Sequence, residues 1–242
     1  MYKGRKISVV LPCYNEEDGI RIVMSDMPSF VDEVIAVDNN SVDGTSIVAK
    51  ELGAIVVPER RQGYGAAYKA GFRHVTGDII VAMDADGTYP RTFIPVLLDV
   101  MFEMDLDFIT CDRTGHKLTK SSRLRVFGNW LLGLAMNLLF WVRIHDSQSG
   151  MWLFKRSILP YLNLTSDGMA FSEEIKIEAF TNRCIHAEEL PIYYRDRAGE
   201  SKLSMWRDGL TNLMFLFRKR FARRNSLPQT LQQSPPADAS PR

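Results

Sequence analysis

Short apolar runs alternate with amphipathic stretches through the first 90 residues of the chain. Residues 7–11, 33–37, 54–57 and 78–83 predict strands, and residues 16–27, 45–52 and 65–75 predict helices between them. We expect the first strand to end at Pro12, because proline cannot donate to a strand ladder. Such alternation is typical of a parallel sheet with right-handed crossovers. The predicted fold class is therefore α/β, with an open, mostly parallel sheet and flanking helices.

The length of the chain favours a single domain. Its 242 residues, 45% of them apolar, suffice for one sizeable core, which we place in residues 1–224. Residues 225–242 are polar and rich in proline, which predicts a disordered tail. The opening residues lack the pattern of a secretory signal, and the three scattered cysteines fit no disulfide framework. We therefore expect a cytoplasmic protein.

Polar residues follow three of the predicted strands. They are Tyr14-Asn15-Glu16, Asp38-Asn39-Asn40 and Asp84-Ala85-Asp86. Ligands of open α/β sheets bind beyond the carboxyl ends of the strands. An Asp-x-Asp is often only a turn, but carboxylates held at a strand end can also bind Mg²⁺ or Mn²⁺. Such a cation offsets the charge of a diphosphate leaving group, so we favour Asp84 and Asp86 as metal ligands.

Two further features of this half point to a nucleotide. Asp38 is placed to accept hydrogen bonds from a base or ribose, whereas Asp43 or Ser41 caps the following helix. Small residues around Gly65 precede a helix, where backbone can approach a nucleotide, although an ordinary glycine turn explains them equally well. No Gly-x-Gly-x-x-Gly follows the first strand, which argues against a dinucleotide-binding domain.

The second half of the chain has the opposite charge and a more apolar character. Residues 1–112 carry 10 basic and 18 acidic residues (net −8), and residues 113–242 carry 20 and 11 (net +9). The uncharged segment 126–142 has a stripe of Asn129, Gly133 and Asn137. We favour a helix at a membrane interface there, with a buried core helix and a membrane span as alternatives.

A second amphipathic helix is predicted over residues 204–224. Its apolar face steps by three and four residues and leads into five basic residues among the seven at 218–224. Such a helix is typical of membrane-surface binding, and a solvated helix end is the simpler alternative. The apolar face of this predicted helix consists of Trp206, Leu210, Leu213, Met214, Phe217 and Phe221.

Six motifs in order along the chain resemble glycosyltransferase family 2, and the last two resemble its dolichyl-phosphate mannose or glucose synthases. They are LPCYNE (11–16), VDNNSVDGT (37–45), GYGAA (63–67), MDADGTYP (83–90), DSQSGM (146–151) and GESKL (199–203). The resemblance implies a GT-A fold, an inverting transfer, a nucleoside-diphosphate sugar donor and a dolichyl or polyprenyl phosphate acceptor.

The resemblance also implies roles for individual residues. The donor would be bound by Pro12, Tyr14, Asn15, Glu16, Asp38, Gly65, Asp84 and Lys202, with Lys202 at the diphosphate and the metal at Asp84 and Asp86. Gln148 and Ser149 would lie at the acceptor. Guanidinium groups bind phosphate in a forked geometry, which adds Arg113, Arg123 and Arg125 to the acceptor side. The catalytic set is then Asp86, Arg113, Arg123 and Lys202.

We therefore expect a hexosyltransferase, peripheral at the cytosolic face of a membrane, with no nucleic-acid partner. An alternative is a family 2 enzyme that glycosylates a saccharide hydroxyl. That reaction needs a base, and Glu174 is a candidate, although an acid in the first turn of a helix is also a common dipole partner. A third alternative is a lectin-like or scaffold protein that retains only the fold.

Overall fold

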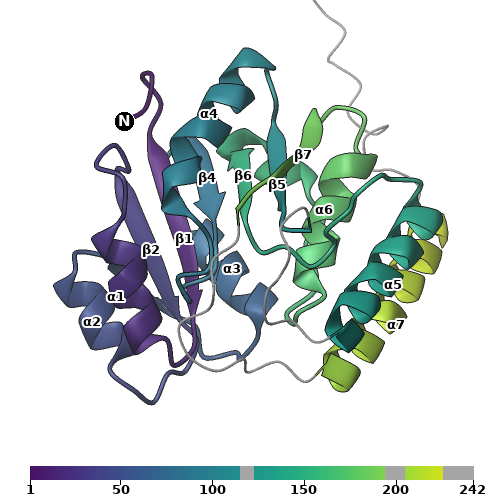
Figure 1. Ribbon diagram of the computed structural model, residues 1–242, viewed down its shortest axis with the longest axis horizontal. Helices are drawn as coiled ribbons and strands as arrows, with labels where there is room; N and C mark the ends of the chain where they lie inside the picture. The colour runs from purple at the N-terminus through teal and green to yellow at the C-terminus, as the bar shows by residue number, and fades with distance from the viewer. Residues whose placement is uncertain (115–122, 194–204, 226–242) are drawn as a thin grey trace, which may run out of the picture.

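The computed structural model describes residues 1–114, 123–193 and 205–225, and in them one sheet runs in the order β3-β2-β1-β4-β6-β5-β7 (Figure 1). The strands are β1 Ile7–Cys13, β2 Glu33–Asp38, β3 Ile55–Pro58, β4 Ile79–Ala82, β5 Phe108–Asp112, β6 Trp152–Lys155 and β7 Ala187–Pro191. The helices are α1 Glu17–Ser25, α2 Thr45–Glu51, α3 Tyr64–Phe72, α4 Ile94–Glu103, α5 Arg123–Phe140, α6 Phe171–Thr181 and α7 Met205–Asn225.

All strands of this sheet except β6 point the same way. β1 pairs in parallel with β2 and β4, and β5 with β7, while β6 is antiparallel to both of its neighbours. The predicted mostly parallel α/β sheet is confirmed. The chain leaves β1 for β2 on one side and returns to β4 on the other, which creates the kind of switch point where such sheets bind ligands.

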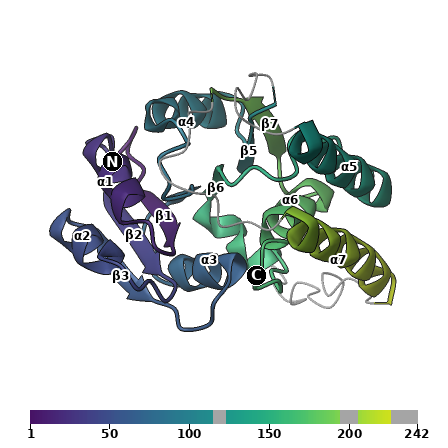
Figure 2. The ribbon, with the colours of Figure 1, turned by 60° about the horizontal axis from the view of Figure 1, so that its bottom comes forward.

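The two faces of the sheet carry separate cores. Alternate residues of β1 point to opposite faces, so Val9 packs with α1, α2 and α4, and Val10 packs with α3 and α6. Figure 2 shows α4 and α3 on opposite sides of the strands. A third cluster, which includes Met136, Ile177 and Leu216, joins α5 and α7 to α6. The helices α5 and α7 therefore lie side by side at one end of the sheet.

The prediction that Pro12 ends the first strand is wrong. β1 continues to Cys13, and Pro12 is paired with Val37 of β2. The carbonyl oxygen of Cys13 accepts a hydrogen bond from the backbone N of Asn39, which follows β2. The carbonyl oxygen of Val10 accepts one from the backbone N of Met83, which follows β4. Successive residues of a strand direct their backbone hydrogen bonds alternately to the two neighbouring strands, so the backbone of Pro12 faces β4. The β1–β4 pairing has already ended there, because its last β1 residue is Val10. Proline costs no hydrogen bond at such a position.

The two predicted amphipathic segments are both helical. α5 covers most of the uncharged segment 126–142, and α7 covers residues 205–224 of the predicted helix and also Asn225. Among the described residues, no helix is long and apolar enough to cross a bilayer. The predicted tail beyond residue 225 lies outside the described residues.

Candidate functional site

The polar strand ends meet at one edge of the sheet. Cys13, Asp38 and Ala82 end the adjacent parallel strands β1, β2 and β4, so the residues that follow them converge. The antiparallel strand β6 begins at the same edge, which brings the preceding residues 146–151 there as well. Residues 146–150 belong to the connection between α5 and β6 and form the loop 146–150. Five of the six motifs thus meet at this edge, since Gly63 and Tyr64 of the motif 63–67 donate to Asn39 and Asp84 there. The sixth motif, 199–203, lies outside the described residues.

Asp84 lies between Tyr64 and Gly150. The Tyr64 hydroxyl donates to Asp84 Oδ1 at 2.8 Å. A Cβ atom built on Gly150 would lie 2.4 Å from the Tyr64 hydroxyl and 2.9 Å from both Asp84 oxygens, so any other residue there would have to displace these groups or the loop. Burial, and then the neighbouring charge of Asp84, raises the pKa of Tyr64 well above its ordinary value. Tyr64 therefore stays a neutral donor that orients the carboxylate.

Asp86 is held by the turn that follows it. It is buried, and its Oδ1 accepts hydrogen bonds from the backbone N of Thr88 at 3.1 Å and from the Thr88 hydroxyl at 2.6 Å. Gly87 has a φ of +77°, which glycine adopts without strain. Thus the Asp84-Ala85-Asp86 turn presents two oriented carboxylates beyond β4, and these are the hard oxygen ligands that Mg²⁺ and Mn²⁺ prefer.

Asp38 and Asn15 bind the loops around the first two strands. Asp38 accepts from the backbone N of Ser41 at 2.9 Å and from the Ser46 hydroxyl at 2.5 Å. Asn15 accepts from the backbone N of Val42 at 2.8 Å. These side chains shape the wall of the predicted donor site. Asp43 accepts hydrogen bonds from the backbone N and the hydroxyl of Thr45 at the start of α2, although the N-cap residue of this helix is Gly44.

The other predicted donor residues occupy different environments. Pro12 is half-buried, Tyr14 is 39% exposed, and the Glu16 backbone N donates to Thr45 at 2.8 Å. Gly65 faces protein instead, because a Cβ there would lie 2.3 Å from the Ser166 carbonyl oxygen and 2.8 Å from Phe171 Cβ. The close backbone approach that requires Gly65 is therefore to another part of the chain.

Arg113 binds a carboxylate of its own chain. Its Nε and Nη2 donate to Asp146 Oδ2 and Oδ1 at 2.6 and 2.9 Å. Burial alone would raise the pKa of Asp146, but the charge and hydrogen bonds of Arg113 outweigh it and lower the pKa. The two guanidinium N–H groups that we expected to bind a lipid phosphate thus bind the Asp146 carboxylate, and Arg113 anchors the loop 146–150.

Gln148 and Ser149 are partly or fully buried in the loop 146–150. Gln148 Nε2 donates to Glu173 Oε1 at 2.7 Å, and its Oε1 accepts from Asn212 of α7 at 3.2 Å. Ser149 Oγ is buried and has no hydrogen-bond partner among the described residues. Gln148 therefore links the loop to both α6 and α7. Of the remaining predicted site residues, Lys202 lies outside the described residues, and of Arg123 and Arg125 only the backbone, at the start of α5, is described.

Glu174 does not have the surroundings of a catalytic base. It is fully buried and accepts from the backbone N atoms of Thr165 and Ser166 at 2.9 and 2.7 Å. Lys219 adds an ion pair at 2.7 Å, and also pairs with Glu178 at 2.9 Å. Lys219 is therefore not part of the predicted surface cluster at 218–224, because helical periodicity turns it toward α6.

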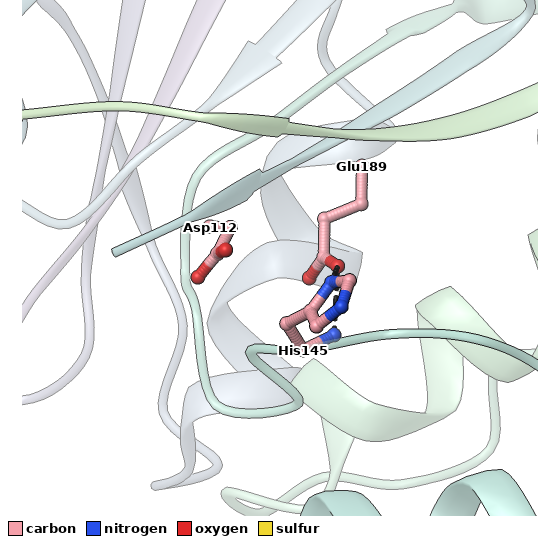
Figure 3. A group of neighbouring side chains, drawn as sticks. All are labelled: Asp112, His145 and Glu189. Atoms are coloured by element: carbon pink, nitrogen blue, oxygen red, sulfur yellow. Dashed lines mark hydrogen bonds and ion pairs between the residues drawn. The ribbon is translucent and has the colours of Figure 1, made fainter. Parts of the chain in front are cut away.

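A second group of possible metal ligands lies behind the loop. Asp112, His145 and Glu189 place ligand atoms within 4.8 Å of one another (Figure 3). Glu189 already accepts from the backbone N atoms of His145 and Asp146 at 2.7 and 2.9 Å, and His145 Nδ1 lies 2.8 Å from it. We interpret Glu189, together with His145, as an anchor for the loop 146–150, whereas Asp112 Oδ1 accepts from the backbone N of Thr114 at 2.7 Å.

Comparison with known proteins identifies the family. The sequence pattern of glycosyl transferase family 2 matches residues 8–162. The chain belongs to this family. Dolichyl-phosphate hexose transferase of Haloferax volcanii is 32% identical over 211 residues, which span 86% of this chain and 91% of that protein. The low-salt glycan biosynthesis hexosyltransferase Agl6 of the same organism is 33% identical over 220 residues, or 87% of this chain, but the chain spans only 52% of Agl6.

A solved structure has the same fold. Glucosyl-3-phosphoglycerate synthase of Mycobacterium tuberculosis, in a complex with Mn²⁺, UDP-glucose and phosphoglyceric acid, superposes with a TM-score of 0.71. It is 23% identical, and the match covers 93% of this chain and 82% of that one. The expected GT-A fold is confirmed. The family match and the curated relatives show that the chain is a glycosyltransferase.

Three features of the site escaped the sequence analysis. Tyr64 and Gly150 contact Asp84, and Lys176 is buried beneath the loop 146–150. Tyr64 and Gly150 both lie within the family motifs, but the motifs do not indicate that these residues contact Asp84. Lys176 gave no signal, because a lysine in a helix with several charges resembles a solvent-exposed residue.

Proposed function

We propose that the chain transfers a hexose from a nucleoside-diphosphate sugar to a dolichyl or polyprenyl phosphate, with inversion, at the cytosolic face of a membrane. The observation that carries the proposal is the pair Asp84 and Asp86, oriented beyond β4 by Tyr64 and Thr88 within a family 2 fold. One relative that is matched over most of both chains is named for dolichyl phosphate, which supports the choice of a lipid phosphate.

Asp84 and Asp86 would hold a Mg²⁺ or Mn²⁺ ion. Both carboxylates lie at the strand end and supply oxygen ligands, and the similar synthase structure contains Mn²⁺ with UDP-glucose. The bound cation would stabilise the negative charge that develops on the departing nucleoside diphosphate. Pro12, Tyr14, Asn15, Glu16 and Asp38 would form the nucleotide side of this site.

The acceptor side would lie where the loop 146–150 approaches α5. The helix α5 begins at Arg123, so Arg123 and Arg125 are adjacent to the apolar segment that would meet the lipid. An acceptor phosphate needs cations to orient it and no base to deprotonate it. The buried and bound state of Glu174 supports this choice over a hydroxyl acceptor. Lys202 would reach the donor diphosphate.

The outward faces of α5 and α7 support binding to a membrane surface. On α5 the small and polar residues Gly133 and Asn137 face the protein, whereas Trp130 and Leu138 are 58% and 68% exposed. On α7, Asn212 is buried and Met214 is 56% exposed. Apolar residues thus face outward as well as toward the core, whereas an ordinary soluble helix has a polar outer face. The outward-facing apolar residues are Val126, Phe127, Trp130, Leu131, Leu134, Leu138, Leu210, Met214, Phe217 and Phe221.

Exposed basic residues border this apolar surface. Arg143 follows α5, and Arg218 and Arg220 lie on α7. Tryptophan is favoured at membrane interfaces, and each cation near an anionic leaflet contributes about 1 kcal/mol. We therefore propose that lipid headgroups and acyl chains cover these two helices, which would place the acceptor phosphate beside the loop 146–150.

A donor screen tests the proposed function. GDP-mannose, UDP-glucose and UDP-N-acetylglucosamine would each be incubated with the enzyme and Mn²⁺, with and without a short polyprenyl phosphate. We expect one donor to be consumed much faster when the lipid phosphate is present, with a glycosyl phospholipid as product. Turnover with a saccharide acceptor and none with the lipid would favour the polysaccharide alternative. No cleavage under any condition would favour a scaffold role.

A further inference from the structure

Lys176 is buried at the centre of the second half of the molecule. It lies on α6, and its side chain is completely buried. Its Nζ donates to the carbonyl oxygens of Asp146, Ser147 and Ser149 at 3.0, 2.8 and 2.8 Å. An ammonium group has three N–H donors, so these three bonds use all of them.

Two anionic and two cationic groups are gathered around the loop. Asp146 is paired with Arg113, and Glu189 of β7 binds the backbone of His145 and Asp146. Lys176 supplies the second positive charge. A buried ammonium is retained only where its lost hydration is replaced, and here three carbonyl dipoles and two carboxylates replace it.

The same loop forms one wall around Asp84. Gly150 follows Ser149 directly, and a Cβ on Gly150 would collide with the Asp84 carboxylate. The backbone N of Gly150 donates to the Tyr89 hydroxyl at 2.6 Å. A displacement of the carbonyls that Lys176 holds would therefore be transmitted, through a single residue, to the surroundings of Asp84.

We propose that Lys176 is a positioning residue for glycosyl transfer, which gathers the carbonyls of Asp146, Ser147 and Ser149 and so holds Gly150 against Asp84. The inference rests on the proposed donor role of Asp84. Among the described residues, the hydrogen bonds of Lys176 Nζ go to the loop 146–150 and to Ser172. Its loss should affect the reaction step and the position of the loop, while the separate core between β1, α1 and α4 persists.

Lys176→Met is the principal variant. Methionine has a similar unbranched shape but removes one hydrogen-bond donor from each of three buried carbonyls. We expect kcat for donor consumption to fall at least about tenfold and KM for the donor to change less than about threefold. Lys155→Met is the control, because Lys155 ends β6 at the opposite edge of the sheet and pairs with Asp105 and Asp107. It should keep kcat within about twofold of the parent enzyme.

Trp152 gives a readout that does not depend on activity. Its indole Nε1 donates to Ser149 O at 3.0 Å, so it reports directly on the loop. In a background where Trp130, Trp141 and Trp206 are phenylalanine, the emission maximum of Trp152 should shift in Lys176→Met and stay unchanged in Lys155→Met. If donor cleavage is absent in the parent enzyme too, the proposed function fails, and this emission shift still decides whether Lys176 holds the loop.

Ser172→Ala keeps the test decisive if Lys176→Met does not fold. The Ser172 hydroxyl donates to Ser149 O at 2.9 Å, so its removal weakens the same anchor more mildly. We expect a kcat loss of about threefold together with a Trp152 emission shift. A folded Lys176→Met with kcat within about twofold of the parent enzyme and an unshifted emission would overturn the proposal. The same outcome in Ser172→Ala would overturn it if Lys176→Met is unfolded.

Discussion

Gly150 lies so close to Asp84 that a methyl group on its Cα would come within 2.9 Å of both carboxylate oxygens. Gly150→Ala should therefore displace either the loop 146–150 or Asp84. Misplacement of a reacting group by about 1 Å can cost about a hundredfold in rate, and we expect a loss of that order in kcat for donor cleavage. The measurement is steady-state turnover with the donor found in the screen.

The matched control for Gly150→Ala is Gly168→Ala. A Cβ on Gly168 would meet nothing within 4 Å, so this substitution should leave turnover within about twofold of the parent enzyme. Parental activity in Gly150→Ala would show that the close contact with Asp84 does not matter to the reaction.

Asp86→Ala should remove metal-dependent turnover. A methyl group cannot bind the cation that we assign to Asp84 and Asp86, and the loss of one such electrostatic contribution typically costs about a hundredfold to a thousandfold in kcat. Turnover would be measured against Mn²⁺ concentration, alongside direct Mn²⁺ binding. Asp78→Ala, at the opposite edge of the sheet, is the control. Undiminished turnover in excess chelator would contradict the metal assignment.

The first half of the fold was predictable because its signals are local. Short apolar runs and the polar residues after them predicted which side chains meet beyond β1, β2 and β4, and Asp84 and Asp86 lie at that edge. The prediction at Pro12 was wrong because the rule that proline ends a strand ignores the neighbouring strands. The β1–β4 pairing has already ended at Val10, so the missing N–H of Pro12 costs no hydrogen bond to β4.

The second half was less predictable because burial there is set by tertiary contacts. Residues Phe171 to Ala179 of α6 are all buried, although Glu173, Glu174, Lys176 and Glu178 are charged types typical of a surface. Their hydrogen-bond and ion-pair partners lie in the loop 146–150, in residues 163–166 and in α7. For the same reason the sequence assigned Arg113 to a ligand, whereas the structure pairs it with Asp146.

The stability of the protein should fall as the pH rises from about 5 to 8 in part because of Glu173. Burial raises the pKa of Glu173 from 4.5 to about 8, against the smaller opposing effects of Gln148 and Lys176. In that range the folded carboxyl holds a proton that the unfolded chain has released. The unfolded state then binds fewer protons, so the free energy of unfolding decreases as the pH rises through this window.

Glu173→Gln tests this pH dependence. Glutamine does not titrate and has nearly the same shape, so the free energy of unfolding in urea should depend less on pH between about 5 and 8 than it does in the parent protein. The exposed Glu51→Gln should retain the parental slope. Parallel slopes for the parent and Glu173→Gln would show that Glu173 releases its proton at an ordinary pH.

Binding to anionic vesicles should depend on the exposed apolar face of α5. Trp130→Ser together with Leu138→Ser removes two large side chains from the proposed interface, and burying each such side chain contributes about 1.5–3 kcal/mol. We expect flotation with vesicles of about 30% phosphatidylserine to weaken at least about tenfold, and high salt to weaken parental binding. Val42→Ser, at an 89% exposed residue in the loop before α2, is the control. Absence of parental binding at low salt would refute the interface.

Arg123→Ala and Glu174→Gln together distinguish a phosphate acceptor from a hydroxyl acceptor. A phosphate monoester has a second pKa of about 6, so it is already anionic at neutral pH and needs a cation rather than a base. Arg123→Ala should therefore reduce transfer to polyprenyl phosphate by about tenfold or more while donor binding persists. Arg113→Ala should also reduce transfer, but it releases Asp146 and so disturbs the loop as well.

Glu174→Gln should instead act on stability. Its carboxylate is buried among the backbone of Thr165 and Ser166 and the ammonium of Lys219, and weakening those hydrogen bonds should cost about 1–3 kcal/mol. The folded fraction should transfer the sugar at nearly the parental rate, which a thermal unfolding curve and initial rates on the same sample would show. If Glu174→Gln abolishes transfer while Arg123→Ala remains near normal, a carboxylate base is at work, and a saccharide hydroxyl becomes the better acceptor.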